Sequence, residues 1–345
     1  MIGRHAVAAI AAAVLSASVT AQSDRTDDFI RGQMKQQRIP GLSLLVVKNG
    51  AIVKQAGYGY GDVAKMVPAT PDTVYKIASV SKAVLATGVL TLVQDGKLAL
   101  DDPVGKYLDA APASWSSITV RHLLSHTSGL VREGPAFDPV KVQSDAEVIK
   151  SAYRLPLRFA PGERYEYGNL NYFALAEIIR KASGRSWTEY MDAKVFKPAG
   201  MTTTYPTNAK VRVANLAVGY VDNDDPRPAP QWAALRPSGA FLSTVLDLAK
   251  WDAALDGNRL LTATTRSEMW TAVKLRDGSV APYGLGWFVN ANKGRTRVQH
   301  TGGMPGTRAG FVKYLEDRLT IIVLMNLDDV DIEAIVGGLA ALYLS

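Results

Sequence analysis

The spacing of hydrophobic positions near the start of the chain predicts a helix followed by two β-strands. Residues 24–37 are polar with periodic apolar positions, which predicts a surface helix. The runs Gly41–Lys48 and Ala51–Tyr60 then carry β-branched and aromatic residues. Asn49-Gly50 joins them, and this dipeptide strongly favours a two-residue hairpin. These residues therefore predict an antiparallel strand pair.

Further along, the apolar spacing changes to that of a helix. From Val80 an apolar stripe recurs every three to four residues until Gly96, a residue type that commonly ends helices. Residues from about 100 to 280 are typical of helices and loops. A last apolar segment from Asp331 predicts a helix packed on a sheet. Before it, the chain has four more strand-like runs, Tyr283–Asn290, Arg295–His300, Gly310–Leu315 and Leu319–Leu327.

Strands at both ends with helices between them predict a single sheet assembled from the two ends of the chain. The expected fold class is α+β, with a mostly antiparallel sheet and flanking helices from residues 22–100 and 240–345. A helical lobe over residues 101–239 is inserted between these two parts. A functional site is expected where the lobe meets the sheet, because pockets favour such junctions.

The N-terminus has the pattern of a secretory signal peptide. Arg4 and His5 precede the apolar run 6–15, and small residues occupy 16–21. The apolar or small stretch of about 16 residues is shorter than the roughly 20 needed to span a bilayer. We expect residues 1–21 to be cleaved, leaving a periplasmic or secreted protein without a stable membrane anchor.

Composition narrows the classes of function. Hydrophobic residues make up 47% and charged residues 21%, which is ordinary for a globular protein with a core. The formal charge of +7 is spread without basic runs, so we expect no nucleic-acid partner. The chain has no Cys, which excludes disulfides, thiolate catalysis and zinc–thiolate sites.

Ser79 and Lys82 are candidates for a nucleophile and its base. They stand at the start of the predicted helix, three positions apart, so that both side chains share one helix face. A lysine can act as a base when burial or a nearby cation lowers its pKa. Taken alone, the pattern is weak, because about one chance match is expected in a chain of this length, and it fits a helix-capping serine and a solvated lysine better.

Two later motifs supply complementary groups. Tyr167 and Asn169 lie in a loop before a helical run, where a phenol can relay a proton and an amide can orient a carbonyl. His300 is followed by Thr301, Gly302 and Gly303 at the end of a strand run. Small residues there let a substrate lie against the strand edge, and the Gly303 N–H could stabilise an oxyanion together with that of Ser79.

The order and single occurrence of these three motifs identify a resemblance. Each motif occurs once, in the order helix start, loop, late strand. With the neighbouring segments, they make the chain resemble the serine β-lactamase and penicillin-binding-protein superfamily, in its class C-like branch of β-lactamases, D-alanyl-D-alanine carboxypeptidases, D-aminopeptidases and esterases. The segments that carry it span the mature chain: Ile118–Leu130, Pro161–Asn169, Pro237–Thr244 and Tyr283–Trp287.

The resemblance implies a role for each motif residue. Ser79 would be the acylated nucleophile and Lys82 its general base. Tyr167 would shuttle protons and help to activate the deacylating water, and Asn169 would contact the substrate. His300 would supply electrostatic help or a hydrogen bond. No cofactor or metal is implied. The expected partner is a peptide or other small-molecule substrate, such as one derived from the cell wall.

His300 departs from the pattern of true class C β-lactamases, which usually carry Lys there. A histidine has a reference pKa near 6.5 and is only partly charged at neutral pH. This favours peptide, amide or ester hydrolysis, with β-lactam hydrolysis as the alternative. Gly168, where Ser is more usual, removes one hydroxyl from the site. The loops Val131–Val140 and Asp222–Trp232 are expected to set specificity.

Other functions find less support in the sequence. No Gly-x-Ser-x-Gly elbow of an α/β-hydrolase occurs. His122 and His126 have the i, i+4 spacing of zinc ligands, but no Glu follows His122 and apolar residues lie between them. Gly57–Gly61 lies within a predicted strand, unlike a dinucleotide-binding loop. A catalytically inert penicillin- or peptide-binding module remains an alternative of another class.

Overall fold

The computed structural model describes residues 25–141, 143–207, 213–230, 236–239, 241–292 and 294–344. The predicted signal segment, residues 1–21, lies outside these ranges. Within them, every helix is too short or too polar to cross a bilayer.

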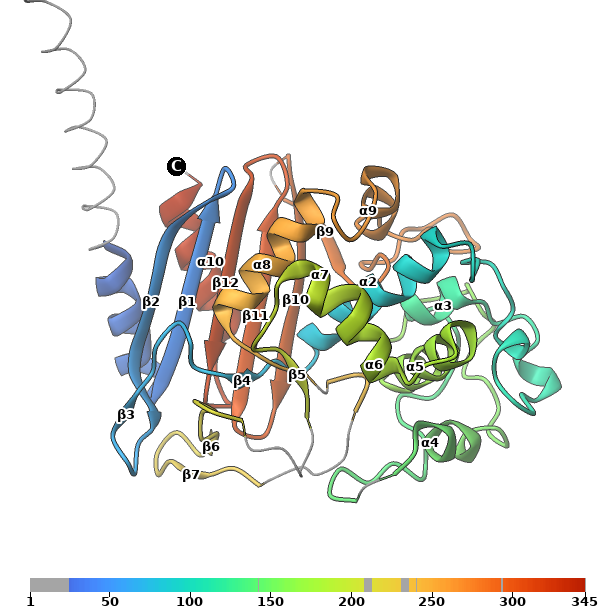
Figure 1. The fold of residues 1–345 in the computed structure, drawn as a ribbon, viewed down its shortest axis with the longest axis horizontal. Coiled ribbons are helices and arrows are strands. Elements are labelled where there is room, and N and C mark those ends of the chain that lie inside the picture. The colour runs from blue at the N-terminus through green and yellow to red at the C-terminus, as the bar shows by residue number, and fades with distance from the viewer. Residues whose placement is uncertain are drawn as a thin grey trace, which may run out of the picture.

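A seven-stranded antiparallel sheet forms the centre of the described protein, in the order β3-β2-β1-β12-β11-β10-β9 (Figure 1). Its middle pair joins the two ends of the chain, with Leu45 opposite Ile322. This confirms the predicted fold class. The strands are β1 (Gly41–Lys48), β2 (Ala51–Asp62), β3 (Val67–Pro68), β9 (Phe288–Asn292), β10 (Arg295–Met304), β11 (Thr307–Tyr314) and β12 (Leu319–Met325).

The predicted hairpin between the first two strands is confirmed. Asn49 and Gly50 both have positive φ, 52° and 81°, which is the backbone of a type I′ turn. Both faces of the sheet are covered, so β12 is buried at every position. The helix over residues 25–37 and α10 (Ile332–Tyr343) cover one face, and α2 (Val80–Gln94) and α8 (Val245–Asp256) pack on the other (Figure 1).

Short helices lie beside the sheet and around α2 (Figure 1). They include α3 (Val120–Leu124), α4 (Asp145–Ser151), α5 (Leu170–Ser183), α6 (Trp187–Met191), α7 (Lys197–Ala199) and α9 (Ala263–Met269), with the 3₁₀ turns η1 (Val104–Lys106) and η2 (Ala113–Trp115) and the π-helical turn η3 (Asp192–Phe196). Small strands, β4 (Tyr75–Lys76), β5 (Tyr205–Pro206), β6 (Tyr220–Val221), β7 (Arg227–Pro228) and β8 (Phe241–Ser243), were not expected. Strands of two or three residues are too short to leave an alternating pattern.

Several strand boundaries differ from the prediction, and two of them, in β9 and β10, differ most. β9 begins at Phe288 rather than at Tyr283, which makes only an isolated bridge to Phe288. β10 continues past His300 to Met304, through Gly302 and Gly303. The two glycines weaken the sequence pattern of a strand, but they pair with β11 in regular register.

The extension of β10 creates a free strand edge beside α2. β9 pairs with β10 only between Arg295 and Gln299, so residues 300–304 reach beyond it. A Cβ atom at Gly302 would lie 2.9 Å from the Ser79 backbone nitrogen, and also against the Ile77 carbonyl. Only glycine permits this close approach between the strand edge and the start of the helix.

Candidate active site

Ser79 lies at the N-terminus of α2 with its hydroxyl free of a capping role. The preceding residue, Ala78, has a φ of 45°, a left-handed conformation that turns the chain sharply into the helix. Ser79 occupies the N-cap position but its side chain makes no capping hydrogen bond. Its Oγ lies 3.2 Å from Nζ of Lys82 instead. The local structure therefore favours the catalytic interpretation of Ser79 over the capping one.

Lys82 is completely buried and held by three oxygen atoms. Besides Ser79 Oγ, its Nζ lies 2.7 Å from Asn169 Oδ1 and 2.8 Å from the carbonyl oxygen of Ser238. The solvated lysine considered from the sequence is thus excluded. The segment with Ser238 is fixed on α2, because the Phe241 N–H donates to the Ser81 hydroxyl at 3.1 Å.

Burial lowers the pKa of Lys82 well below its usual value, and the nearby Arg236 lowers it further. A neutral amine has two N–H donors and one lone pair. Asn169 Oδ1 and the Ser238 carbonyl can only accept, so they take the two N–H groups. The lone pair is then left for the Ser79 hydroxyl, which is the arrangement a general base requires.

Tyr167 lies over Ser79 and Lys82. The centre of its ring is 4.8 Å from Lys82 Nζ, and its hydroxyl is buried near the Ser79 side chain. Burial raises the pKa of Tyr167, so the phenol is neutral and carries a proton. Its oxygen has no hydrogen-bond partner of ordinary geometry among the described residues. The hydroxyl is therefore available to a substrate or leaving group.

Asn169 begins α5 but uses its side chain in the site. It occupies the N-cap position without a capping hydrogen bond, because Oδ1 accepts from Lys82 and Nδ2 donates to Glu133. Glu133 Oε1 also lies 3.5 Å from Arg236, whose guanidinium packs 4.3 Å from the Phe137 ring. No sequence pattern pointed to Arg236. Glu133 lies in the loop Val131–Val140, but nothing distinguished it within that loop.

His300 is buried and neutral. Its Nδ1 lies 2.7 Å from the Thr301 carbonyl oxygen, which can only accept, so Nδ1 carries the proton. Nε2 then accepts from the Tyr283 hydroxyl at 2.8 Å. Burial lowers the pKa of His300 to about 3, with Lys82 contributing in the same direction. Both ring nitrogens are thus occupied by protein groups, and Tyr283 was not identified from the sequence.

A cleft of about 200 Å³ lies over these residues. Ser79, Tyr167, Asn169 and Gly303 line it, whereas Lys82, Thr301, Gly302 and His300 do not. The remaining lining residues are Ala78, Arg132, Glu133, Arg236, Ser238, Gly239 and Met304. A larger cavity of about 560 Å³, around Trp270 and Lys313, contains none of the predicted site residues.

The residues of the described ranges form no group of three His, Asp or Glu side chains that could hold a metal ion. His122 and His126, the pair considered for zinc, have separate hydrogen-bond partners. His122 Nδ1 accepts from the Thr119 N–H, and His126 Nδ1 contacts Gly168 and Asn171.

Comparison with known proteins shows the family to which the chain belongs. The β-lactamase family model matches residues 26–342. The chain belongs to the β-lactamase family. It is 29% identical over 310 residues to penicillin-binding protein 4* of Bacillus subtilis (strain 168), covering 83% of this chain and 68% of that protein. It spans 62% of the length of other curated relatives that it matches.

Solved structures of family members have the same fold. The octameric penicillin-binding protein homologue from Pyrococcus abyssi superimposes with a TM-score of 0.80 at 30% identity, covering 93% of this chain and 76% of that one. D-amino acid amidase from Ochrobactrum anthropi SV3 gives 0.77 at 25% identity, covering 94% and 95%. The β-lactamase/transpeptidase-like fold thus includes hydrolases among its members.

Proposed function

We propose that the protein is an exported serine hydrolase that forms a covalent acyl-enzyme on Ser79. The observation that carries the proposal is the buried Lys82 amine. Its Nζ lies 2.7 and 2.8 Å from two oxygens that can only accept and 3.2 Å from Ser79 Oγ, so that a neutral amine would give its two N–H groups to the acceptors and keep its lone pair for the Ser79 hydroxyl. A neutral lysine in this position can take the serine proton.

The reaction would proceed in two balanced halves. In the first, Lys82 takes the proton of Ser79, Oγ attacks the substrate carbonyl, and the backbone N–H groups of Ser79 and Gly303 stabilise the oxyanion. The leaving group departs with a proton from Tyr167, which regains one from the Lys82 ammonium. In the second half, water gives a proton to the same pair and attacks the acyl carbonyl. The acyl C–O bond to Ser79 then breaks, Oγ takes that proton back from the Lys82 ammonium, and the acid is released with the neutral amine and the Ser79 hydroxyl restored.

The proposed substrates are peptides, amides or esters, with D-Ala-D-Ala-type peptides and short-chain esters as the first to test. The neutral state of His300 supports this choice over β-lactams, because the site lacks at this position a cation for the β-lactam carboxylate. The similarity to a D-amino acid amidase adds support for amide substrates. Penicillins and cephalosporins remain the second candidate.

Labelling and turnover test the proposal together. A fluorophosphonate should add one adduct to the wild-type protein, detected by intact mass, and none to Ser79→Ala. Lys82→Ala should slow labelling by several orders of magnitude. The kcat/KM values for a p-nitrophenyl ester, a D-Ala-D-Ala peptide and a chromogenic cephalosporin on one preparation then rank the substrates. If the wild-type protein is neither labelled nor active, the inert binding module is the correct interpretation.

Export is tested separately. Protein recovered from the periplasm or medium of an expressing bacterium should have an intact mass that lacks about residues 1–21. Full-length protein confined to the cytoplasm would contradict the proposed export without affecting the chemistry.

A further inference from the structure

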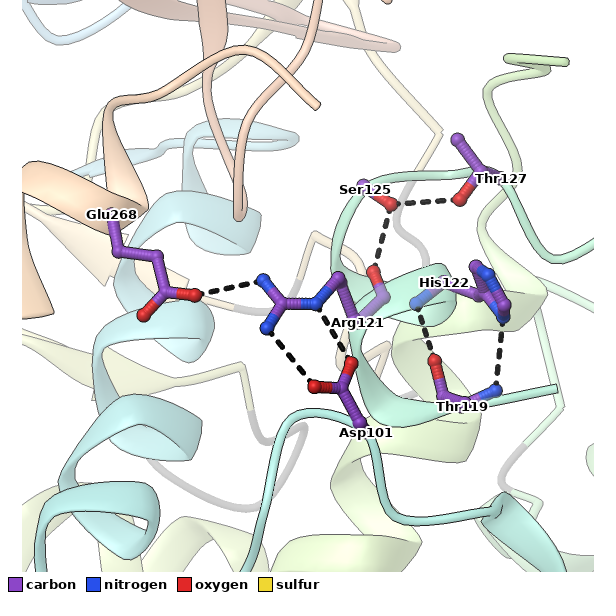
Figure 2. Close-up of polar contacts among 7 residues, drawn as sticks. All are labelled: Asp101, Thr119, Arg121, His122, Ser125, Thr127 and Glu268. Atoms are coloured by element: carbon purple, nitrogen blue, oxygen red, sulfur yellow. Dashed lines mark hydrogen bonds and ion pairs between the residues drawn. The ribbon is translucent and has the colours of Figure 1, made fainter. Parts of the chain in front are cut away.

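His126 follows α3 in a turn that neighbouring residues hold rigidly. It is fully buried and has a φ of 58°, a left-handed conformation that is costly for most residues. Ser125, just before it, donates to the Arg121 carbonyl at 2.7 Å and lies 2.9 Å from the Thr127 hydroxyl (Figure 2).

The helix α3 itself is anchored at its start. Thr119 and His122 form a reciprocal capping box, and Arg121 makes ion pairs to two acidic side chains from other segments, Asp101 and Glu268 (Figure 2). These contacts fix the direction in which the chain leaves the helix, and hence the place of the His126 ring.

Hydrogen bonds determine which ring nitrogen of His126 carries the proton. The Ser128 hydroxyl donates to Asn171 Oδ1 at 2.6 Å, since it already accepts the Leu130 N–H. The Asn171 amide nitrogen therefore faces His126, and donates to Nδ1 at 3.0 Å. The Gly168 backbone N–H also donates to Nδ1, at 3.3 Å. Nδ1 is thus an acceptor, and the neutral ring has its proton on Nε2.

The ring also packs directly against Tyr167, with 4.4 Å between their centres. Burial lowers the pKa of His126 well below its usual value, so the ring stays neutral beside Lys82. His126 therefore touches Tyr167 through its ring and the next residue, Gly168, through Nδ1.

We infer that His126 is a positioning residue that holds the turn Tyr167–Asn169 in its catalytic geometry. The inference rests on the proposed function, since it assigns His126 to the machinery of that reaction. A histidine suits the place because it combines a flat face for Tyr167 with an acceptor for the Gly168 N–H. His126 itself would not contact the substrate.

The kinetic consequence follows from the proposed role of Tyr167. An amine leaving from an amide needs a proton, whereas p-nitrophenolate and fluoride leave without one. Displacing Tyr167 should therefore lower kcat/KM for an amide much more than kcat/KM for an ester or the rate of fluorophosphonate labelling, because neither of the last two includes the deacylation step in which Tyr167 also acts. A general loss of folded protein would reduce all three by the same factor.

Substitutions at His126 test this. His126→Gly accepts the positive φ but removes the ring, and we expect its kcat/KM for an amide to fall about 100-fold, as for a misplacement of about 1 Å. Its kcat/KM for a p-nitrophenyl ester should fall less than tenfold. His126→Asn tolerates the same φ and offers an acceptor, so it should recover much of the amide activity. Asn258→Gly, the same kind of change at another left-handed position (φ 56°) that is exposed and outside the cleft, is the matched control and should leave both kcat/KM values unchanged.

Asn171→Ala provides a second test should His126→Gly fail to fold. It removes one donor to Nδ1 and keeps the ring. We therefore expect a smaller loss of kcat/KM than in His126→Gly, again larger for the amide than for the ester. Equal losses on amide and ester, or no loss in either variant, would overturn the inference. Absence of wild-type labelling would instead refute the proposed function itself, so the two failures are distinguishable.

Discussion

At the scale of single residues, three charged side chains around the cleft shift the pKa of Lys82: Arg236 and Arg132 lower it, and Glu133 raises it. All three act in addition to burial. Arg236 and Glu133 lie together at the cleft, with Glu133 Oε1 3.5 Å from the guanidinium of Arg236. The pKa of Lys82, the proposed general base, therefore depends on residues that do not take part in the proposed proton transfer.

Substitutions of Arg236 and Glu133 should shift the pH profile in opposite directions. Only neutral Lys82 can accept the serine proton, so kcat/KM falls as pH drops below the pKa of Lys82. Arg236→Gln should move this acid limb to higher pH, and Glu133→Gln should move it to lower pH. Rate profiles for a p-nitrophenyl ester measure both shifts. If both variants shift the limb in the same direction, the electrostatic account is wrong.

At the scale of elements, the site depends on the fit between the free edge of β10 and the start of α2. Gly302 and Gly303 are neighbours in sequence but point to opposite faces of the strand. A Cβ at Gly302 would meet backbone atoms, including the Ser79 nitrogen at 2.9 Å, whereas one at Gly303 would meet the Arg308 guanidinium. The backbone near Gly302 cannot move aside without displacing Ser79, whereas the long side chain of Arg308 can move away from Gly303.

The two glycines should therefore respond differently to the same change. Gly302→Ala should reduce kcat/KM by about 100-fold or more, because it displaces Ser79 from its position. Gly303→Ala should cost far less, since Arg308 can adopt another rotamer. Ester hydrolysis and fluorophosphonate labelling measure the difference. Similar losses in both variants would show that the close approach at Gly302 is not what positions Ser79.

At the scale of the whole molecule, a buried ion pair ties α8 to the sheet. Lys313 of β11 lies 2.8 Å from Asp252 of α8, and both side chains are almost completely buried. The Thr320 hydroxyl of β12 donates to the other oxygen of Asp252, also at 2.8 Å. Lys313 also pairs with the half-exposed Asp256 at 2.7 Å and lines the larger cavity, and neither Lys313 nor Asp252 lines the cleft.

Lys313→Met should destabilise the fold by about 3–5 kcal/mol, because it leaves the Asp252 carboxylate buried without its partner. The double variant Lys313→Met/Asp252→Leu removes both charges and should regain most of that loss. Urea unfolding of the two variants and the wild type provides the comparison. A double variant no more stable than the single one would contradict the uncompensated charge as the cause.

The sequence by itself determined the order of the elements and predicted the residues of the proposed chemistry. The Asn49-Gly50 turn, the helix after Ser79 and the late strands follow from local periodicity and turn residues. The sequence also predicted Ser79, Lys82, Tyr167 and Asn169 as site residues. The fold brings these four together, although Ser79 and Asn169 are 90 positions apart in the chain.

Only the tertiary structure decided the protonation states and the supporting residues. The pKa values of Lys82 and His300 depend on burial and on which groups lie nearby, and no local pattern encodes either. Glu133 and Arg236 are of types that occur throughout the chain, and His126, one of four histidines, was considered from the sequence only as a zinc ligand. They become part of the site because loops distant in sequence converge on α2. The low effective dielectric constant of a buried region strengthens each interaction between charges and each hydrogen bond there.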